Sequence, residues 1–359
     1  MTTKFFTLLL TALFFSSFSF AKIFRVGYNG LALTGVDYAD LQAANDAATA
    51  GDTIQIYTSS ATTGTINKKL VIIGYGYNFD VNTNLQAIGT DAPSQANITF
   101  ITGSNGSIVY GVSGTFTISA SANETDSISN ITFQRCNGGF YLTNYISYGP
   151  ISNIKIISSV TQNISRQYNG ANAKPITNLQ VYNCILNSIA LEGPATTATI
   201  VNCVSSTTLT IDLNDASVVV KNCIFASSNS TANINTVYDN NFFIEAQPAV
   251  LPAGSNNRWS QDWGTIFNRL GGTNDNPGNY YDASFDEDYY VLKVGSPAIN
   301  GGFNAANAVT NCGIYGGEPA YVYKLSGVPA VPAIYKLTAP GSAASSNPYN
   351  ITISVRSNN

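Results

Sequence analysis

Histidine is absent from this chain of 359 residues. Its absence excludes Ser-His-Asp hydrolysis, Cys-His proteolysis and zinc sites built on imidazole. Charged residues are scarce at 10%, where an ordinary globular protein has roughly a quarter. A net charge of −4 offers nothing to neutralise a phosphate backbone, so it argues against a nucleic-acid partner. With 44% hydrophobic residues, the chain can nevertheless bury a large core, which excludes general disorder.

Apolar runs long enough to cross a bilayer, about 18 residues, are also missing. The run at residues 5–15 has the length of a signal-peptide core, and Lys4 precedes it. Ser19 and Ala21 place small residues at the −3 and −1 positions of a cleavage site. We therefore predict a signal peptide at 1–21. The protein is expected to be exported to the cell surface, the extracellular space or the periplasm, and not to span the membrane.

An internal repeat dominates the centre of the chain. The segments ISNITFQRC, ISNIKIISS and ITNLQVYNC align without gaps at 128–136, 151–159 and 176–184, and related segments follow at 197–203 and 217–223. Each segment alternates apolar and polar residues and is rich in Ile, Val and Thr, as is typical of a strand. A strand every 19 to 25 residues leaves no room for a full helix between strands. The repeat predicts an all-β solenoid, a right-handed parallel β-helix.

Two columns of aligned residues run through the repeat. One column consists of Cys136, Ser159, Cys184, Cys203 and Cys223. The other, one position earlier, consists of Arg135, Ser158, Asn183, Asn202 and Asn222. Asparagine suits coil corners because it tolerates left-handed backbone and can form hydrogen bonds along the stack.

The cysteines number five, with Cys312 outside the column. An odd number in an exported protein leaves at least one thiol without a partner in its own chain. Stacked strands rarely bring thiols to disulfide geometry, and no C-x-x-C motif occurs. We expect a ladder of buried, reduced cysteines rather than a redox or metal site.

A rival architecture also fits part of the repeat. Residues 176–186, ITNLQVYNCIL, match the leucine-rich-repeat template. That fold needs a helical or 3₁₀ segment after each strand, whereas the linking residues here are rich in Ser, Thr and Asn. The parallel β-helix is therefore the favoured interpretation.

The solenoid needs covered ends, because its first and last coils would otherwise expose the core. We assign 22–51 to an N-terminal strand and capping helix, 52–320 to the β-helix with loop excursions at 248–281, and 321–359 to a C-terminal tail or cap.

The capping helix is expected over 38–49. Asp37 is the predicted N-cap, Leu41, Ala44 and Ala48 line one face, and Gly51 ends the helix. The closing ITISV at 351–355 is an alternating strand that we place across or beside the last coils.

Several longer motifs resemble a known family. They are YADLQAANDAATAGDTIQIY (38–57), INKKLVIIGYGY (66–77), the NC-containing coils, YVLKVGSPAINGG (290–302) and CGIYGGEPAYVYKLSGVPAVPAIYKL (312–337). With them the chain resembles secreted right-handed parallel β-helix proteins of the pectate-lyase-like superfamily, and more narrowly a group from Bacteroidetes. The resemblance implies the fold but little chemistry, because this fold hosts lyases, hydrolases, adhesins and non-enzymes. The Gly-His-Gly motif of its polygalacturonan hydrolases is missing here.

One residue is a weak catalytic candidate. Calcium-dependent lyases of this fold use converging acids and an Arg or Lys base, and Arg135 interrupts a column of Ser and Asn. In the alternative interpretation, Arg135 is simply a solvent-facing residue at a coil corner.

Two further candidate sites lie late in the chain. The acidic cluster of Asp282, Asp286 and Asp288 is a candidate site for a cation such as Ca²⁺. The favoured alternative is a solvated acidic turn. A glycan-stacking platform is the second candidate, formed by Trp259, Trp263, Tyr280 and Tyr281. Its alternative is a small satellite core beneath a long loop.

Our leading prediction is an exported, non-catalytic β-helix protein that binds polysaccharide or surface glycan through a loop or a flat face. Two alternatives stay open at this point. One is a polysaccharide lyase, or another carbohydrate-active enzyme, acting on acidic polysaccharide. The other is an adhesin or matrix protein whose flat Thr/Asn/Ser face meets a partner.

Overall fold

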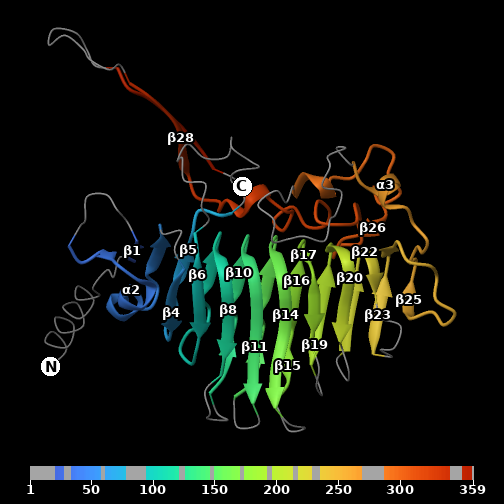
Figure 1. Ribbon diagram of the computed structural model, residues 1–359, viewed down its shortest axis with the longest axis horizontal. Coiled ribbons are helices and arrows are strands. Elements are labelled where there is room, and N and C mark those ends of the chain that lie inside the picture. The colour runs from blue at the N-terminus through green and yellow to red at the C-terminus, as the bar shows by residue number, and fades with distance from the viewer. Residues whose placement is uncertain are drawn as a thin grey trace, which may run out of the picture.

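Stacked coils form a right-handed parallel β-helix in the computed structural model of the protein (Figure 1). The structure describes residues 21–27, 34–57, 61–77, 94–120, 126–145, 149–169, 174–191, 196–212, 217–228, 235–268, 287–339 and 350–357. The fold class predicted from the repeat is confirmed, and the leucine-rich-repeat alternative is wrong, because the coils contain strands where that fold needs helical segments. The predicted signal peptide lies outside the described residues, apart from Ala21.

Three parallel sheets form the walls of the solenoid. Sheet A contains, in spatial order, β2 (Asp37–Tyr38), β1 (Ile23–Val26), β3 (Thr53–Ile56), β5 (Val71–Ile73), β7 (Ile108–Tyr110), β10 (Thr132–Gln134), β13 (Lys155–Ile157), β16 (Leu179–Tyr182), β19 (Thr197–Val201), β21 (Ser217–Lys221), β23 (Thr236–Asp239) and β25 (Ala253–Ser255). Sheet B contains β4 (Thr62–Ile66), β6 (Ala96–Phe100), β8 (Ser113–Ser119), β11 (Asn137–Tyr145), β14 (Val160–Asn169), β17 (Ile185–Leu186), β18 (Ser188–Ala190), β20 (Val204–Asp212), β22 (Ile224–Ser228) and β24 (Phe242–Phe243). The short sheet C contains β9 (Ile128–Ser129), β12 (Ile151–Ser152) and β15 (Ile176–Thr177).

The corner between sheets A and B is made by one residue per coil in the left-handed backbone region. The residues are Arg135, Ser158, Asn183, Asn202, Asn222, Asn240 and Asn256, with φ between 50° and 58°. We call them the corner column. The left-handed backbone predicted for its asparagines is confirmed, and Asn130, Asn153 and Asn178 form a second such column between sheets C and A.

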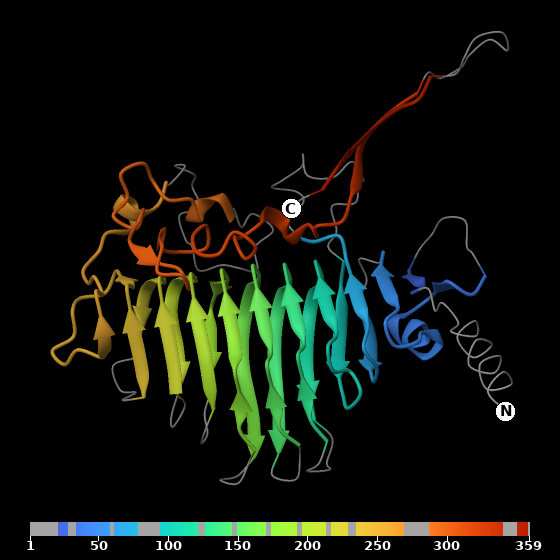
Figure 2. The same ribbon diagram turned by 180° about the vertical axis from the view of Figure 1, so that it is seen from behind.

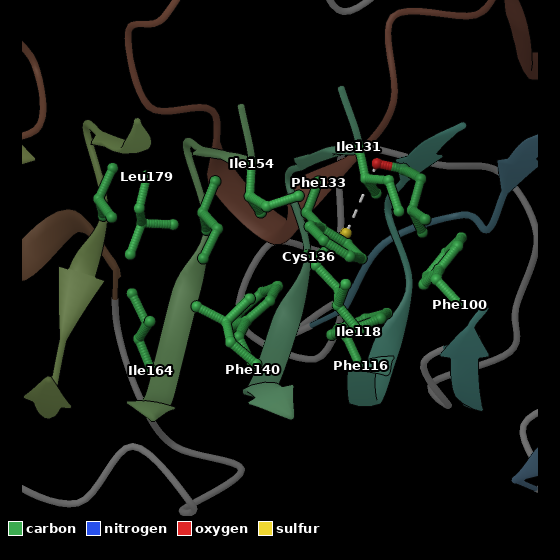
Figure 3. Close-up of a cluster of buried hydrophobic side chains, with 14 of the residues drawn as sticks. Phe100, Phe116, Ile118, Ile131, Phe133, Cys136, Phe140, Ile154, Ile164 and Leu179 are labelled. Carbon is green, nitrogen blue, oxygen red and sulfur yellow. Dashed lines mark hydrogen bonds between the residues drawn. The ribbon is translucent and has the colours of Figure 1, made fainter. Parts of the chain in front are cut away.

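The core is apolar along the length of the solenoid. Its aromatic centre is a cluster of Phe100, Phe116, Phe133 and Phe140, with ring centroids 5.0 to 5.5 Å apart in contacting pairs (Figure 3). The cysteine column lies against this core, and all five cysteines are buried and free, as predicted for its members.

Within the cysteine column, side chains accept hydrogen bonds from the backbone of the preceding coil. Ser159 Oγ accepts from the Cys136 backbone N–H at 3.0 Å, and Cys223 Sγ accepts from the Cys203 N–H at 3.4 Å. Asn241 extends the same column, because its Oδ1 accepts from the Cys223 N–H at 2.8 Å. Side chains of the cysteine column therefore accept hydrogen bonds from backbone N–H groups at the bend between sheets A and B, which the pairing of strands does not satisfy.

The helix α2 (Leu41–Ala47) covers the N-terminal end of the stack (Figure 1). Its buried Leu41 and Ala44, with Ala48 after it, form the predicted apolar face. The predicted N-cap was wrong. Asp40 caps the helix by accepting from the Ala43 N–H at 2.8 Å, whereas Asp37 lies in β2 and binds the Arg25 guanidinium. The helix ends before Gly51, which lies in the turn into β3.

The parallel sheets end earlier than the predicted boundary at residue 320. In the described part of the chain their last strand is β25, which itself lies within the 248–281 segment that we assigned to loops. The chain then leaves the coils through α3 (Trp263–Ile266) and η2 (Glu287–Tyr290). No helix in the described residues is long and apolar enough to cross a membrane.

A long segment then returns along the solenoid. We call residues 302–328 the strap. It contains the antiparallel pair β26 (Gly302–Phe303) and β27 (Val309–Thr310) and ends with η3 (Leu325–Gly327). Figure 2 shows the strap in orange and red along the ends of the strands, followed by β28 (Ala333–Thr338) and β29 (Thr352–Arg356), which project from the body. The strand predicted at 351–355 is present, but it pairs with β28 and not with the last coils.

Candidate ligand-binding groove

The strap is attached to the solenoid by side chains of the corner column. Arg135 Nη1 donates to the Val328 carbonyl at 2.6 Å, and Ser158 Oγ donates to that of Tyr321 at 2.5 Å. The strap therefore runs antiparallel to the direction in which the coils are added.

The asparagines continue this attachment in the following coils. Asn183 Nδ2 donates to the carbonyls of Ile314 and Gly316 at 2.8 and 2.7 Å. Asn202 Nδ2 donates to those of Asn311 and Gly313 at 2.9 and 3.2 Å, and Asn222 Nδ2 donates to that of Phe303 at 2.9 Å. Left-handed backbone turns each amide away from the sheets and towards the strap.

A groove of about 530 Å³ lies between the strap and the outer face of sheet A. Its floor comes from β16, β19, β21, β23 and β25, which present one in-register column of outward residues. These residues are Tyr182, Val201, Lys221, Asp239 and Ser255, with Thr199 and Val219 beside them. Its wall includes Phe303, Asn304, Asn307, Glu318 and Tyr321 of the strap.

Aromatic rings stand at two places in the groove. Tyr182 from the floor stacks on Tyr321 from the wall, with centroids 5.0 Å apart and planes 26° apart. Burial, together with the nearby Tyr321 hydroxyl, raises the pKa of Tyr182, so its phenol stays a neutral hydrogen-bonding group. Phe303 lies opposite Val309 in the β26–β27 register and keeps 46% of its surface exposed.

The charges in the groove nearly cancel. Among the described residues that line it, Lys221 is the one cation, and Asp239 and Glu318 are the anions. Lys221 Nζ lies 3.8 Å from Asp239 Oδ2. Asp239 Oδ1 also accepts hydrogen bonds from the Ser255 backbone N–H at 2.9 Å and from its hydroxyl at 3.1 Å. The groove thus has a small negative charge and many uncharged donors and acceptors.

Arg135 lies under the strap, away from solvent. Its side chain is buried, and burial lowers the pKa of the guanidinium. The interpretation of Arg135 as a solvent-facing corner residue was wrong, because the strap covers this corner. In the structure, Arg135 attaches the end of the strap to the solenoid through its hydrogen bond to the Val328 carbonyl.

The predicted aromatic platform is split between two cores. Trp259 stacks on Phe243 at a centroid distance of 4.0 Å, against the end of the main core. Trp263 is buried in a second cluster with Phe267 and Tyr290, so its ring offers no open face for a sugar. Tyr280 and Tyr281 lie outside the described residues.

The acidic cluster is also mostly outside the described part of the chain. Asp282 and Asp286 fall outside it, and of Asp288 only the backbone, in η2, is described. Elsewhere in the described residues, no three Cys, Asp or Glu side chains come together as a metal site. Calcium binding at 282–288 stays a prediction.

The groove residues escaped sequence analysis because the strap brings them together. Tyr182 and Lys221 belong to the repeat, but the sequence at outward positions of a strand does not indicate which segment covers them. The strap residues Phe303 and Tyr321 lie in a segment without strand periodicity. One usable signal was present, since five members of the corner column are asparagines, whose side-chain amides can form hydrogen bonds with a segment outside the sheets.

Comparisons of the chain with models of protein families, with curated proteins and with solved structures gave no significant match.

Proposed function

We propose that this is an exported, non-catalytic β-helix protein of the pectate-lyase-like superfamily that binds an uncharged glycan at the cell surface or outside the cell. The groove between the strap and sheet A carries this proposal. Its volume of about 530 Å³ is that of a site for a small ligand, and it opens along several coils. An open groove of this kind suits a chain molecule that enters from the side.

The lining of the groove suits sugars. Phe303 offers an exposed aromatic face, on which the C–H face of a pyranose ring stacks well. Asn304, Asn307, Thr199 and Ser255 provide uncharged hydrogen-bonding groups for hydroxyls. This mixture of a flat apolar surface and neutral polar groups matches the two kinds of surface on a sugar.

The charges favour a neutral glycan over an acidic one. A uronate would meet two carboxylates, Asp239 and Glu318, and a single lysine whose charge Asp239 already partly neutralises. The arginine considered as a lyase base is buried beneath the strap. Both observations support a binding protein rather than a lyase acting on acidic polysaccharide.

The proposal is tested by glycan-array binding of the purified mature protein, followed by calorimetry with the best ligand. Phe303→Ala is expected to weaken binding about tenfold, or about 1.4 kcal/mol. Tyr182→Phe removes only a hydroxyl and is expected to have a smaller effect. Val294→Ala is the matched control, because Val294 is 96% exposed and does not line the groove.

Two results would overturn the proposal. One is glycan binding that is equally strong in Phe303→Ala and in the control. The other is new absorbance at about 235 nm when the protein is incubated with uronate polysaccharides and Ca²⁺, which reports the unsaturated ends that a lyase produces.

A further inference from the structure

The groove between the strap and sheet A is closed at one end. Its floor column begins at Tyr182 in β16, and the neighbouring outward position is Ile157 in β13, which is in register with Tyr182. Ile157 points out of the sheet and is nevertheless only 4% exposed. Ser158, beside it, holds the strap through the Tyr321 carbonyl. The floor is therefore covered at β13, and no described residue of that strand lines the groove.

Two stacked tyrosines form this closed end. Tyr182 belongs to the floor and Tyr321 to the strap, so their stacked rings join the two sides of the groove. Both residues are half-buried. Neither phenol hydroxyl forms a hydrogen bond with another described residue, and a phenol can both donate and accept. The closed end thus presents two hydroxyl groups to a ligand.

A carboxylate lies beside the tyrosines. Glu318 and Tyr321 belong to one turn, in which the Tyr321 N–H donates to the Glu318 carbonyl at 2.9 Å. Glu318 Oε1 accepts a hydrogen bond from the Ala305 N–H at 3.4 Å, whereas Oε2 has no partner in the described part of the chain. An ionised carboxylate accepts stronger hydrogen bonds than a neutral group does. The free oxygen of Glu318 is therefore a strong acceptor for a sugar hydroxyl.

The opposite end of the groove is open. The floor column finishes at Ser255, which is exposed, and β25 is the last strand of sheet A among the described residues. Between the two ends, the Phe303 carbonyl accepts from Asn222 Nδ2 at 2.9 Å, which places Phe303 over the middle coils. The five strands of the floor give the groove a length of about 19 Å, at about 4.8 Å per strand.

We propose that the groove binds the end of a glycan chain and not an internal stretch, with the terminal sugar against Tyr182, Tyr321 and Glu318. This inference rests on the proposed function. A terminal sugar carries a hydroxyl that is consumed by the glycosidic bond at internal positions, and the closed end supplies unpaired partners for it. The next sugars extend past Phe303 towards the open end. An internal stretch would have to continue beyond Tyr182, where the floor is covered.

The test uses the purified mature protein and size fractions of soluble, linear oligosaccharides of the gluco, xylo and manno series. Calorimetry gives both the affinity and the number of proteins bound per sugar chain. We expect one protein per chain at every chain length, because each chain has one matching end. The affinity is expected to rise with chain length until the groove is filled and to stay constant beyond that length.

Two variants distinguish the ends of the groove. Glu318→Gln removes the charge, while its amide oxygen can still accept from the Ala305 N–H, and we expect about tenfold weaker binding at every chain length. Ser255→Ala changes the open end and is expected to weaken the binding only of chains long enough to reach it. Unchanged melting temperatures will show that both variants are folded.

A number of bound proteins that rises with chain length overturns the inference and leaves the proposed function standing. The same conclusion follows if Glu318→Gln binds like the native protein, or if it loses affinity for long chains alone. If none of the three series binds, the inference is wrong, and the glycan array then decides the proposed function by itself. The two failures are therefore distinguishable.

Discussion

At the scale of single residues, the corner column shows why asparagine is repeated at this position. The backbone there is left-handed, which costs most side chains roughly 1–2 kcal/mol but costs asparagine less. The same left-handed turn directs the amide towards the carbonyls of the strap, to which it donates hydrogen bonds. One residue type therefore serves both the bend and the attachment.

These two roles can be separated at Asn202. Asn202→Gly keeps the left-handed backbone but removes the hydrogen bonds to Asn311 and Gly313, and we expect a loss of about 2 kcal/mol. Asn202→Ala removes the same bonds and adds backbone strain, so it is expected to be roughly 1 kcal/mol less stable than the glycine variant. Urea unfolding followed by circular dichroism measures both changes. An alanine variant as stable as the glycine variant would contradict the role of the backbone.

The buried thiols predict a response to alkali. Burial raises the pKa of Cys136 from its ordinary 9.0 to about 12. Above pH 9 the unfolded chain loses this proton while the folded chain keeps it, so folding stability falls as pH rises from 9 towards 12. The loss is about 1.4 kcal/mol per pH unit for one such group.

Cys136→Ser tests this response, and the column itself shows that serine fits, since Ser159 occupies the next position. We expect the variant to lose stability less steeply between pH 9 and 11, by about 1.4 kcal/mol per unit. Urea unfolding at several pH values gives the two slopes. Identical slopes would show that Cys136 does not titrate on unfolding in this range.

At the scale of elements, the strap depends on close backbone contacts as well as on side chains. Gly76 has a φ of 107°, and a Cβ there would lie 2.2 Å from the Ser326 carbonyl oxygen. The Tyr77 N–H donates to that same oxygen at 2.7 Å. The end of the strap is therefore held against the early coils by a contact that only glycine permits.

Gly76→Ala is expected to loosen the end of the strap and to accelerate its proteolysis severalfold. Gly51→Ala is the control, because Gly51 also has a positive φ, 98°, but an added Cβ meets nothing within 4 Å. Both substitutions carry the backbone strain, and only the first adds a clash. The rate of cleavage within 302–328 by a low concentration of protease compares them. Equal rates would assign the effect to strain alone.

The elements also differ in how well they could be predicted from the sequence. The strands of the coils could be predicted from the alternation of Ile and Val with polar residues, and the corner could be predicted from its asparagines. Both features depend on contacts between adjacent repeats, which leave a periodic pattern in the sequence. The path of residues 302–328 could not be predicted, because their contacts with Asn183 and Asn222 span some 80 to 130 positions and leave no periodic pattern. The groove could not be predicted for the same reason, because one of its walls is the strap. The N-cap shifted from Asp37 to Asp40 because Arg25 binds Asp37.

At the scale of the whole molecule, the strap changes the cooperativity of the solenoid. Coils of a simple solenoid contact only their neighbours, so unfolding can proceed from an end. Here one segment binds the corners from Arg135 to Asn222 and thereby links five successive coils. Opening one of these coils disturbs the attachment of the others.

Hydrogen exchange tests this linkage. In the native protein we expect β13, β16, β19 and β21 to share one opening free energy, and Asn202→Gly to lower their protection together. β1, which does not lie under the strap, is expected to keep its protection. A change confined to the coil that contains Asn202 would show that the coils open independently.

The antiparallel attachment also limits how this protein can evolve. Repeat proteins commonly gain or lose whole units, because each new unit finds the same neighbours. Here a duplicated coil between Arg135 and Asn222 would shift every later corner by about 4.8 Å relative to a strap of unchanged length. Such a duplication would be tolerated only together with a matching insertion in the strap, so relatives of different coil number are expected to differ in both segments at once.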